Sequence, residues 1–222
     1  MGAPETDSGK GQRPRWRRWL RRAGITYLVL VVATHLLMAA TVAVARALGE
    51  DPRRHTEGIS NFRIVDDSMW AGGQPDADAY AALAAEGVRL VVDLRTGAAD
   101  DPRRADPDQL RAMGVDYLDI PIGDGHVPSP SQVDQLVEAA RDADGVVFVH
   151  CGGGVGRSST MTAAYRALHD TKPSAADQLA IGPHTLAQAW FVTTGDRNPV
   201  VSRVSEALDA PRRLWSRIRG LA

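Results

Sequence analysis

Cysteine is nearly absent from this sequence: Cys151 is the only one among 222 residues. One cysteine excludes an intramolecular disulfide and any zinc site built from several cysteines. An excess of positive charge is also absent, because the formal net charge is −1. A nucleic-acid-binding domain would carry a basic surface, so nucleic acid is not an expected partner. No residue pattern indicates a metal site, and we expect no cofactor.

Apolar residues make up 44% of the chain, which is enough for the core of one domain of ordinary size. Changes in composition divide the chain into five segments. We expect a basic disordered N-terminus at 1–23, an apolar helix at 24–47, a linker at 48–57, a folded domain at 58–195 and a basic amphipathic helix at 196–222.

The apolar helix has the length of a membrane span. Ile25 to Ala45 contains no formally charged residue. At about 1.5 Å per residue this run crosses the roughly 30 Å hydrocarbon core of a bilayer. Trp16, Trp19 and Tyr27 lie at its start, where an interfacial aromatic belt is expected. The pattern predicts a single-pass transmembrane anchor.

Two other interpretations of this segment stay open. Small residues at 43–45 and 45–47 resemble signal-peptide cleavage sites, although the apolar run exceeds the usual ~7–15 residues. A buried core helix is the second, but such a helix is seldom apolar on every face beside six arginines. By the positive-inside rule those arginines place the N-terminus in the cytoplasm and the domain outside. A domain on the cytoplasmic face is the alternative, since an oxidising compartment would inactivate a reactive Cys151.

Strands and helices alternate after Gly58. We predict strands at 62–65, 68–73, 88–94, 116–122 and 146–150, and helices at 76–87, 106–114, 128–145 and from about 158 onward. Ser131 is the expected cap of the helix at 128–145. The alternation predicts an α/β domain with a central, mostly parallel sheet flanked by helices. Ligands of such sheets bind at the carboxyl ends of the strands, which is where Cys151 lies.

The segment "VVFVHCGGGVGRSS" combines a strand, a glycine-rich loop and a helix start. Its loop consists of Gly152, Gly153, Gly154, Val155 and Gly156. Glycine allows a backbone that turns several N–H groups toward one point, and the following helix adds its positive dipole end. Arg157 supplies a planar fork for two phosphate oxygens, and the same field favours the nucleophilic thiolate of Cys151. The segment predicts a phosphate cradle around a nucleophile.

The stretch "HCGGGVGRSS" matches the signature of cysteine phosphatases, in which five residues separate the cysteine from an arginine that precedes serine or threonine. The chain resembles the dual-specificity branch of the protein tyrosine phosphatase superfamily from Phe62 to Thr193. The resemblance implies that fold for the domain at 58–195. It also implies that Cys151 attacks phosphorus, Arg157 binds the phosphoryl oxygens, Ser158 assists thiolate release and His150 organises the loop.

The family uses an aspartate on a mobile loop as general acid, and "PIGDGHVPSPSQVDQL" resembles that loop. Asp124 is therefore the expected proton donor, and afterwards the base that activates water. Asp116 and Asp119 are competitors, but they fall within a predicted strand. Gln188 is a candidate for positioning the water.

Three functions stay open. The first is a phosphatase for phosphotyrosine, and for phosphoserine or phosphothreonine, in proteins. The second is a phosphoinositide or other lipid phosphatase. A membrane anchor favours the second, whereas the lack of lysine and aspartate at 152–156 favours the first. The third is a catalytically silent phosphate-binding module, against which the intact set of Cys151, Arg157 and Asp124 argues. The substrate is a phosphorylated protein or lipid in either enzyme.

The C-terminal segment is amphipathic and basic. One face carries Val201, Val204, Leu208, Trp215 and Ile218, and the arginines are Arg203, Arg212, Arg213, Arg217 and Arg219. The helix either lies on an anionic membrane surface or packs against the domain. Pro211 is expected to kink it in both cases.

Overall fold

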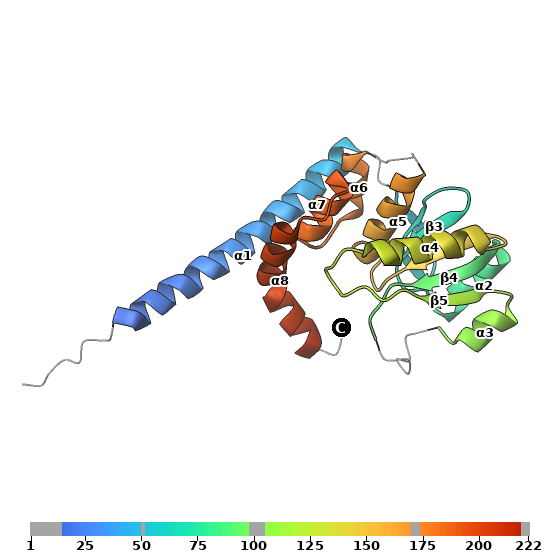
Figure 1. Cartoon of the computed structure of the whole chain (residues 1–222), viewed down its shortest axis with the longest axis horizontal. Coiled ribbons are helices and arrows are strands. Elements are labelled where there is room, and N and C mark those ends of the chain that lie inside the picture. Colours follow the sequence, from blue (N-terminus) through green and yellow to red (C-terminus); the bar gives the residue numbers. More distant parts are fainter. Residues whose placement is uncertain (1–14, 50–51, 98–104, 170–173, 219–222) are drawn as a thin grey trace, which may run out of the picture.

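The computed structural model describes residues 15–49, 52–97, 105–169 and 174–218. They form an α/β domain from which one long N-terminal helix extends (Figure 1). The strands are β1 Arg54–Thr56, β2 Ile59–Ile64, β3 Met69–Gly72, β4 Val88–Asp93, β5 Asp116–Asp119 and β6 Val146–His150. The helices are α1 Arg15–Leu48, α2 Ala77–Ala85, α3 Pro107–Ala112, α4 Pro130–Asp142, α5 Arg157–Leu168, α6 Ala175–Ile181, α7 Leu186–Thr194 and α8 Pro199–Ile218.

The six strands form one sheet in the order β1-β2-β3-β6-β4-β5. β3, β6, β4 and β5 run parallel, while β1, β2 and β3 are joined as antiparallel neighbours. The predicted central, mostly parallel sheet is confirmed. β1 lies in the segment that we expected to be a linker.

The central strand β6 is buried on both faces, which explains its continuous apolar run. Val147 and Val149 pack with Leu136 of α4 and Met161 of α5. Phe148 points to the other face, into a cluster with residues of α2 and α3. Helices therefore cover both faces, and the carboxyl end of β6 opens directly into the glycine-rich loop.

The cap of α4 differs from the expectation. Ser129, not Ser131, is the N-cap, and it forms a reciprocal capping box with Gln132. Pro130 then occupies the first helical turn, where its missing N–H costs nothing. The sequence "SPSQ" offers two serines, and only Ser129 has Gln132 three residues later.

Helix α1 begins at Arg15, earlier than the expected start at 24. Residues 15–23 are therefore helical and not disordered, whereas residues 1–14 of that segment lie outside the described residues. Trp16–Leu48 is long and apolar enough to cross a membrane, by length and composition. Only 6% of its most apolar window is buried, which disfavours the core-helix interpretation.

Helix α8 packs against α7 and α1, as Figure 1 shows. Its buried side is polar, however, and contains Ser205 and Asp209. Val204 and Trp215, which we placed on the packing face, are 45% and 57% exposed. The side chains of Arg217 and Ile218 lie outside the described part of the chain, as does Arg219. In this structure α8 therefore packs against the domain through polar contacts, and binding to a membrane surface stays a prediction.

Candidate active site

Cys151 follows β6 directly and is buried, with 3% of its surface exposed. The alternation of side chains along β6 places its sulfur on the same face as Val149, toward α5. Its N–H donates to the carbonyl of Gly72 on β3 at 3.4 Å. Two neighbouring parallel strands therefore fix the backbone at this position.

The carbonyl groups of the loop are held from outside. Gly152 O accepts from the N–H of Gln74 at 3.0 Å. Gly153 O accepts from Nδ2 of Asn61 at 2.8 Å, and Gly154 O from Nη1 of Arg63 at 2.7 Å.

In a planar trans peptide, the carbonyl of one residue and the N–H of the next point in opposite directions. No cis peptide bond occurs in the described segments. Three outward carbonyls therefore turn the N–H groups of Gly153, Gly154 and Val155 inward. The Gly154 N–H indeed donates to Sγ of Cys151 at 3.3 Å. Inward N–H groups around a sulfur form an anion cradle.

One glycine of the loop, Gly154, is required by its geometry. Gly154 has φ +75°, and a Cβ there would come within 2.4 Å of the Gly73 nitrogen. A Cβ on Gly156 would lie 2.8 Å from Oε1 of Gln188. By contrast, the nearest atom to a Cβ on Gly153 would be 3.9 Å away. The glycine cluster therefore contains a position that requires glycine and a position that has room for a side chain.

The start of α5 completes the cradle. Gly156 is its N-cap and makes no side-chain capping bond, so the first N–H groups of the helix are left for a ligand. Arg157 donates from Nη1 to the carbonyl of Ile122 at 3.3 Å. The hydroxyl of Ser158 lies 3.7 Å from Sγ of Cys151 and is buried. Loop and helix thus bring a sulfur, a hydroxyl and a guanidinium together.

Asp124 lies in the loop between β5 and α4. Its Oδ1 is 3.9 Å from Nη2 of Arg157, and its Oδ2 is 2.8 Å from Nη1 of Arg212. Burial raises the pKa of Asp124, but Arg212 and Arg157 outweigh burial and hold this pKa below its ordinary value. Asp116 and Asp119 are part of β5, as expected. Asp124 is the carboxylate that the fold places against the arginine of the loop.

Gln188, on α7, contacts the Asp124 loop. Its Nε2 donates to His126 O at 3.1 Å, and its Oε1 accepts from His184 N at 3.1 Å. Thr185 adds a bond from its hydroxyl to Gly125 O at 2.8 Å. Both polar atoms of the Gln188 side chain therefore bind backbone groups in this structure.

His150 lies on the opposite face of the sheet from the sulfur. Its Nδ1 is 3.9 Å from Oδ1 of Asp93, and its ring stacks on Phe148. Burial raises the pKa of Asp93, but bonds from Arg95 and the proximity of His150 lower it far more. Tyr117 also donates to Asp93 at 2.9 Å. This polar cluster braces the ends of β4, β5 and β6 beneath the loop.

Four residues of this site were missed at the level of sequence. They are Asn61 and Arg63 on β2, Gln74 in the segment after β3, and Arg212 on α8. One signal existed for Arg63, because a charged residue stands between Phe62 and Ile64 in an apolar strand. The contacts of the other three depend on elements that are distant in the chain.

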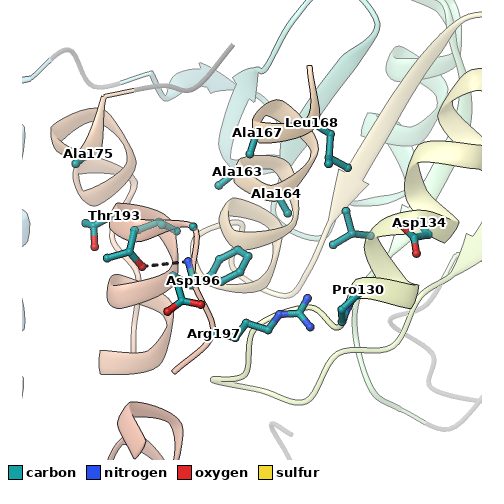
Figure 2. A pocket seen from close by; sticks show the side chains of 15 residues that line it. Pro130, Asp134, Ala163, Ala164, Ala167, Leu168, Ala175, Thr193, Asp196 and Arg197 are labelled. Carbon is teal, nitrogen blue, oxygen red and sulfur yellow. Dashed lines mark hydrogen bonds between the residues drawn. The ribbon is translucent and has the colours of Figure 1, made fainter. Parts of the chain in front are cut away.

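A cavity lies away from the residues that are predicted for catalysis. The cavity between α4, α5 and α7 has a volume of about 520 Å³. Figure 2 shows residues that line it, among them the apolar Ala163, Ala164 and Leu168 and the charged Arg197. None of the residues predicted for catalysis lines it. Among the described residues, no group of three or more His, Cys, Asp or Glu could hold a metal ion.

Comparisons with known proteins agree with this geometry. Residues 52–194 match the family described as DSP-PTPase phosphatase fused to NAD+ kinase. Dual specificity protein phosphatase CDC14C of Homo sapiens is 31% identical over 67 residues, which is 30% of this chain and 15% of that protein. Dual specificity protein phosphatase Mpk3 of Drosophila melanogaster is 42% identical over 65 residues, 27% of this chain and 16% of that protein.

The fold has a solved counterpart. The core catalytic domain of PP-IP phosphatase SIW14 from S. cerevisiae superposes with a TM-score of 0.51 at 14% identity, covering 68% of this chain and 94% of that domain. That likeness concerns the fold alone, whereas the family match covers most of the folded domain. The chain belongs to the dual-specificity phosphatase branch of the protein tyrosine phosphatase superfamily, whose members are cysteine-type phosphatases.

Proposed function

We propose that this chain hydrolyses phosphomonoesters through a phosphocysteine intermediate on Cys151. The observation that supports it most is the loop at 151–157, whose outward carbonyls direct three N–H groups inward around the sulfur. A tetrahedral oxyanion is the ligand that such a cradle and Arg157 suit.

In the first step, the thiolate of Cys151 attacks phosphorus, and a P–S bond forms as the P–O bond to the leaving group breaks. The loop N–H groups and the guanidinium of Arg157 stabilise the charge on the phosphoryl oxygens. Protonated Asp124 gives its proton to the leaving oxygen. The substrate alcohol or phenol then departs.

In the second step, Asp124 is a carboxylate and takes a proton from water. The water oxygen attacks phosphorus, and the P–S bond breaks with its electron pair returning to sulfur. The hydroxyl of Ser158, 3.7 Å from Sγ, stabilises the thiolate as it leaves. Phosphate is released and Asp124 is protonated again.

The substrates that we propose are phosphotyrosine and phosphoserine or phosphothreonine in proteins. Residues 152–156 carry no charged side chain, so binding of the phosphoryl group rests on backbone N–H groups and Arg157. The curated relatives are dual specificity protein phosphatases, although the matched segment is only 15% and 16% of their length. A phosphoinositide or lipid phosphatase is the second candidate, favoured by the apolar helix that would hold the domain at a membrane.

We also propose that α1 anchors residues 58–222 to a membrane as a single-pass helix, with the catalytic domain at 58–195 outside. Support comes from the small buried fraction of α1 and from the arginines before its apolar run. Protease added to intact cells should remove the domain if it lies outside. Its survival would place the domain on the cytoplasmic face.

The catalytic proposal is tested with the full chain in detergent micelles, assayed with para-nitrophenyl phosphate beside Cys151→Ser and Asp124→Ala. Cys151→Ser should abolish turnover, and Asp124→Ala should reduce it about a hundredfold or more. Activity that survives in Cys151→Ser would contradict the mechanism. A folded wild type that binds vanadate without turnover would identify a phosphate-binding module. Comparing kcat/KM for phosphopeptides and for phosphoinositide vesicles separates the two substrate classes.

A further inference from the structure

Arg63 is a charged residue in the interior of the protein. It lies on β2 and is 2% exposed, and its partner on β3 is Ala71. Cross-strand partners share a face of the sheet, so the small side chain of Ala71 leaves room for the long one of Arg63. A buried guanidinium is costly unless its donors and its charge are both satisfied.

The donors of Arg63 are used by the glycine-rich loop, by the start of α5 and by β2. Nη1 donates to the carbonyls of Gly154 at 2.7 Å and of Asn61 at 3.4 Å, and Nη2 donates to the hydroxyl of Ser158 at 3.3 Å. Gly154 and Ser158 are also the two groups that lie next to the sulfur, at 3.3 and 3.7 Å. Arg63 therefore reaches the back of Cys151 through both of its neighbours.

The buried positive charge of Arg63 has few charged groups around it. No Asp or Glu in the described ranges forms an ion pair with it. Burial lowers the pKa of Arg63 to about 10, Cys151 raises it and Arg53 lowers it. The guanidinium thus stays charged at neutral pH, and the sulfur of Cys151 lies beside the two groups to which it donates.

The two arginines at the cradle have separate surroundings. Arg157 contacts the Asp124 loop, on the side where the leaving group must be protonated. Arg63 comes from β2 and contacts the loop through the outward carbonyl of Gly154. Arg157 thus lies on the side of the Asp124 loop, and Arg63 lies on the side of the two groups that contact the sulfur.

We propose that Arg63 is a positioning residue that holds the cradle in its anion-binding shape and supplies the buried positive charge that keeps Cys151 a thiolate. The proposal rests on the proposed function, in which Cys151 is the nucleophile and later the leaving group. It predicts that Arg63 acts on the sulfur even when no substrate is present.

Alkylation by iodoacetamide tests this directly, because Cys151 is the only thiol and the thiolate is the form that reacts. The rate is measured against pH for the full-length wild type, Arg63→Met, Arg63→Gln and Arg63→Lys. The two neutral variants should move the midpoint of the profile to higher pH and slow alkylation at pH 6 by roughly tenfold or more. Arg63→Lys should keep the wild-type midpoint, because lysine keeps the positive charge. It should lower kcat, because lysine cannot donate to Gly154 and Ser158 through the two arms of a guanidinium.

Arg141→Met is the matched control, since it removes one arginine from an exposed position on α4 and should leave the profile unchanged. Circular dichroism identifies variants that are folded, and two neutral substitutions guard against a failure of one to fold. Identical profiles for wild type, folded neutral variants and Arg141→Met would overturn the proposal. A shifted profile in a protein without phosphatase activity would instead support Arg63 and contradict the proposed function.

Discussion

Arg212 of the last helix and Asp124 of the loop after β5 form an ion pair, with 2.8 Å between Nη1 and Oδ2. Arg213 reaches the same loop, with Nη1 3.3 Å from Nε2 of His126. Arg212 thus contacts the predicted general acid, and Arg213 contacts the loop that carries it. Their position gives the C-terminal helix a direct influence on the proton that catalysis needs.

Replacing Arg212 by glutamine should move the basic limb of the pH profile. Asp124 must be protonated to act as acid, so kcat/KM falls as pH rises through its pKa. Burial raises this pKa, while Arg212 and Arg157 lower it, and removing Arg212 leaves a higher value. The basic limb of kcat/KM for para-nitrophenyl phosphate should therefore move to higher pH. Arg203→Gln, on an exposed part of α8, is the control, and equal profiles would contradict the prediction.

Gly154→Ala should destabilise the fold, whereas Gly153→Ala should not. Gly154 has φ +75°, and a Cβ there meets the Gly73 nitrogen at 2.4 Å, so the β3 end or the loop must shift. The backbone conformation alone costs about 1–2 kcal/mol. A drop in Tm of at least roughly 2–4 °C is expected for a chain of this size. Thermal unfolding followed by circular dichroism measures both variants, and equal Tm values would show that the loop adapts.

Ser158→Ala should slow the second chemical step more than the first. Its hydroxyl lies 3.7 Å from the sulfur that leaves phosphorus in that step. Without it the phosphocysteine should accumulate. Stopped-flow release of para-nitrophenol should then show a burst close to one equivalent per enzyme, followed by a slow steady state. A linear trace at the wild-type rate would exclude this role.

Insertion of α1 into a bilayer should separate it from α8. The hydroxyl of Tyr27 donates to Ala207 O at 2.7 Å, and Nε2 of His35 is 3.7 Å from Oδ1 of Asp209. His35 lies near the middle of the apolar run, so a span in this arrangement would carry Asp209 to the bilayer centre, at a cost of roughly 2.5–3.5 kcal/mol or more.

Cross-linking measures this separation. A bismaleimide should join Tyr27→Cys and Ala207→Cys, in a Cys151→Ser background, in detergent micelles but far less in phospholipid vesicles. Tyr27→Cys alone is the control for links between two chains. Equal yields in micelles and vesicles would mean that the helices stay together and that α1 does not span.

The glycine-rich loop could be recognised from the sequence because its information is local. A strand, five intervening residues and an arginine at a helix start are all visible between Val146 and Ser158. The same holds for most strands and helices, whose bounds follow apolar periodicity and glycine. The N-cap of α4 was predicted wrongly because the sequence offers two serines, and the choice between them depends on the capping box of Ser129 with Gln132.

The glycine-rich loop, the α/β alternation and the apolar run of α1 could all be predicted, because neighbouring residues specify each of them. The folded chain was needed to show that Asn61, Arg63 and Gln74 bind the loop carbonyls and that Arg212 pairs with Asp124. Those partners are far apart in the chain. Their distances depend on strand order and helix packing, and no local pattern specifies these.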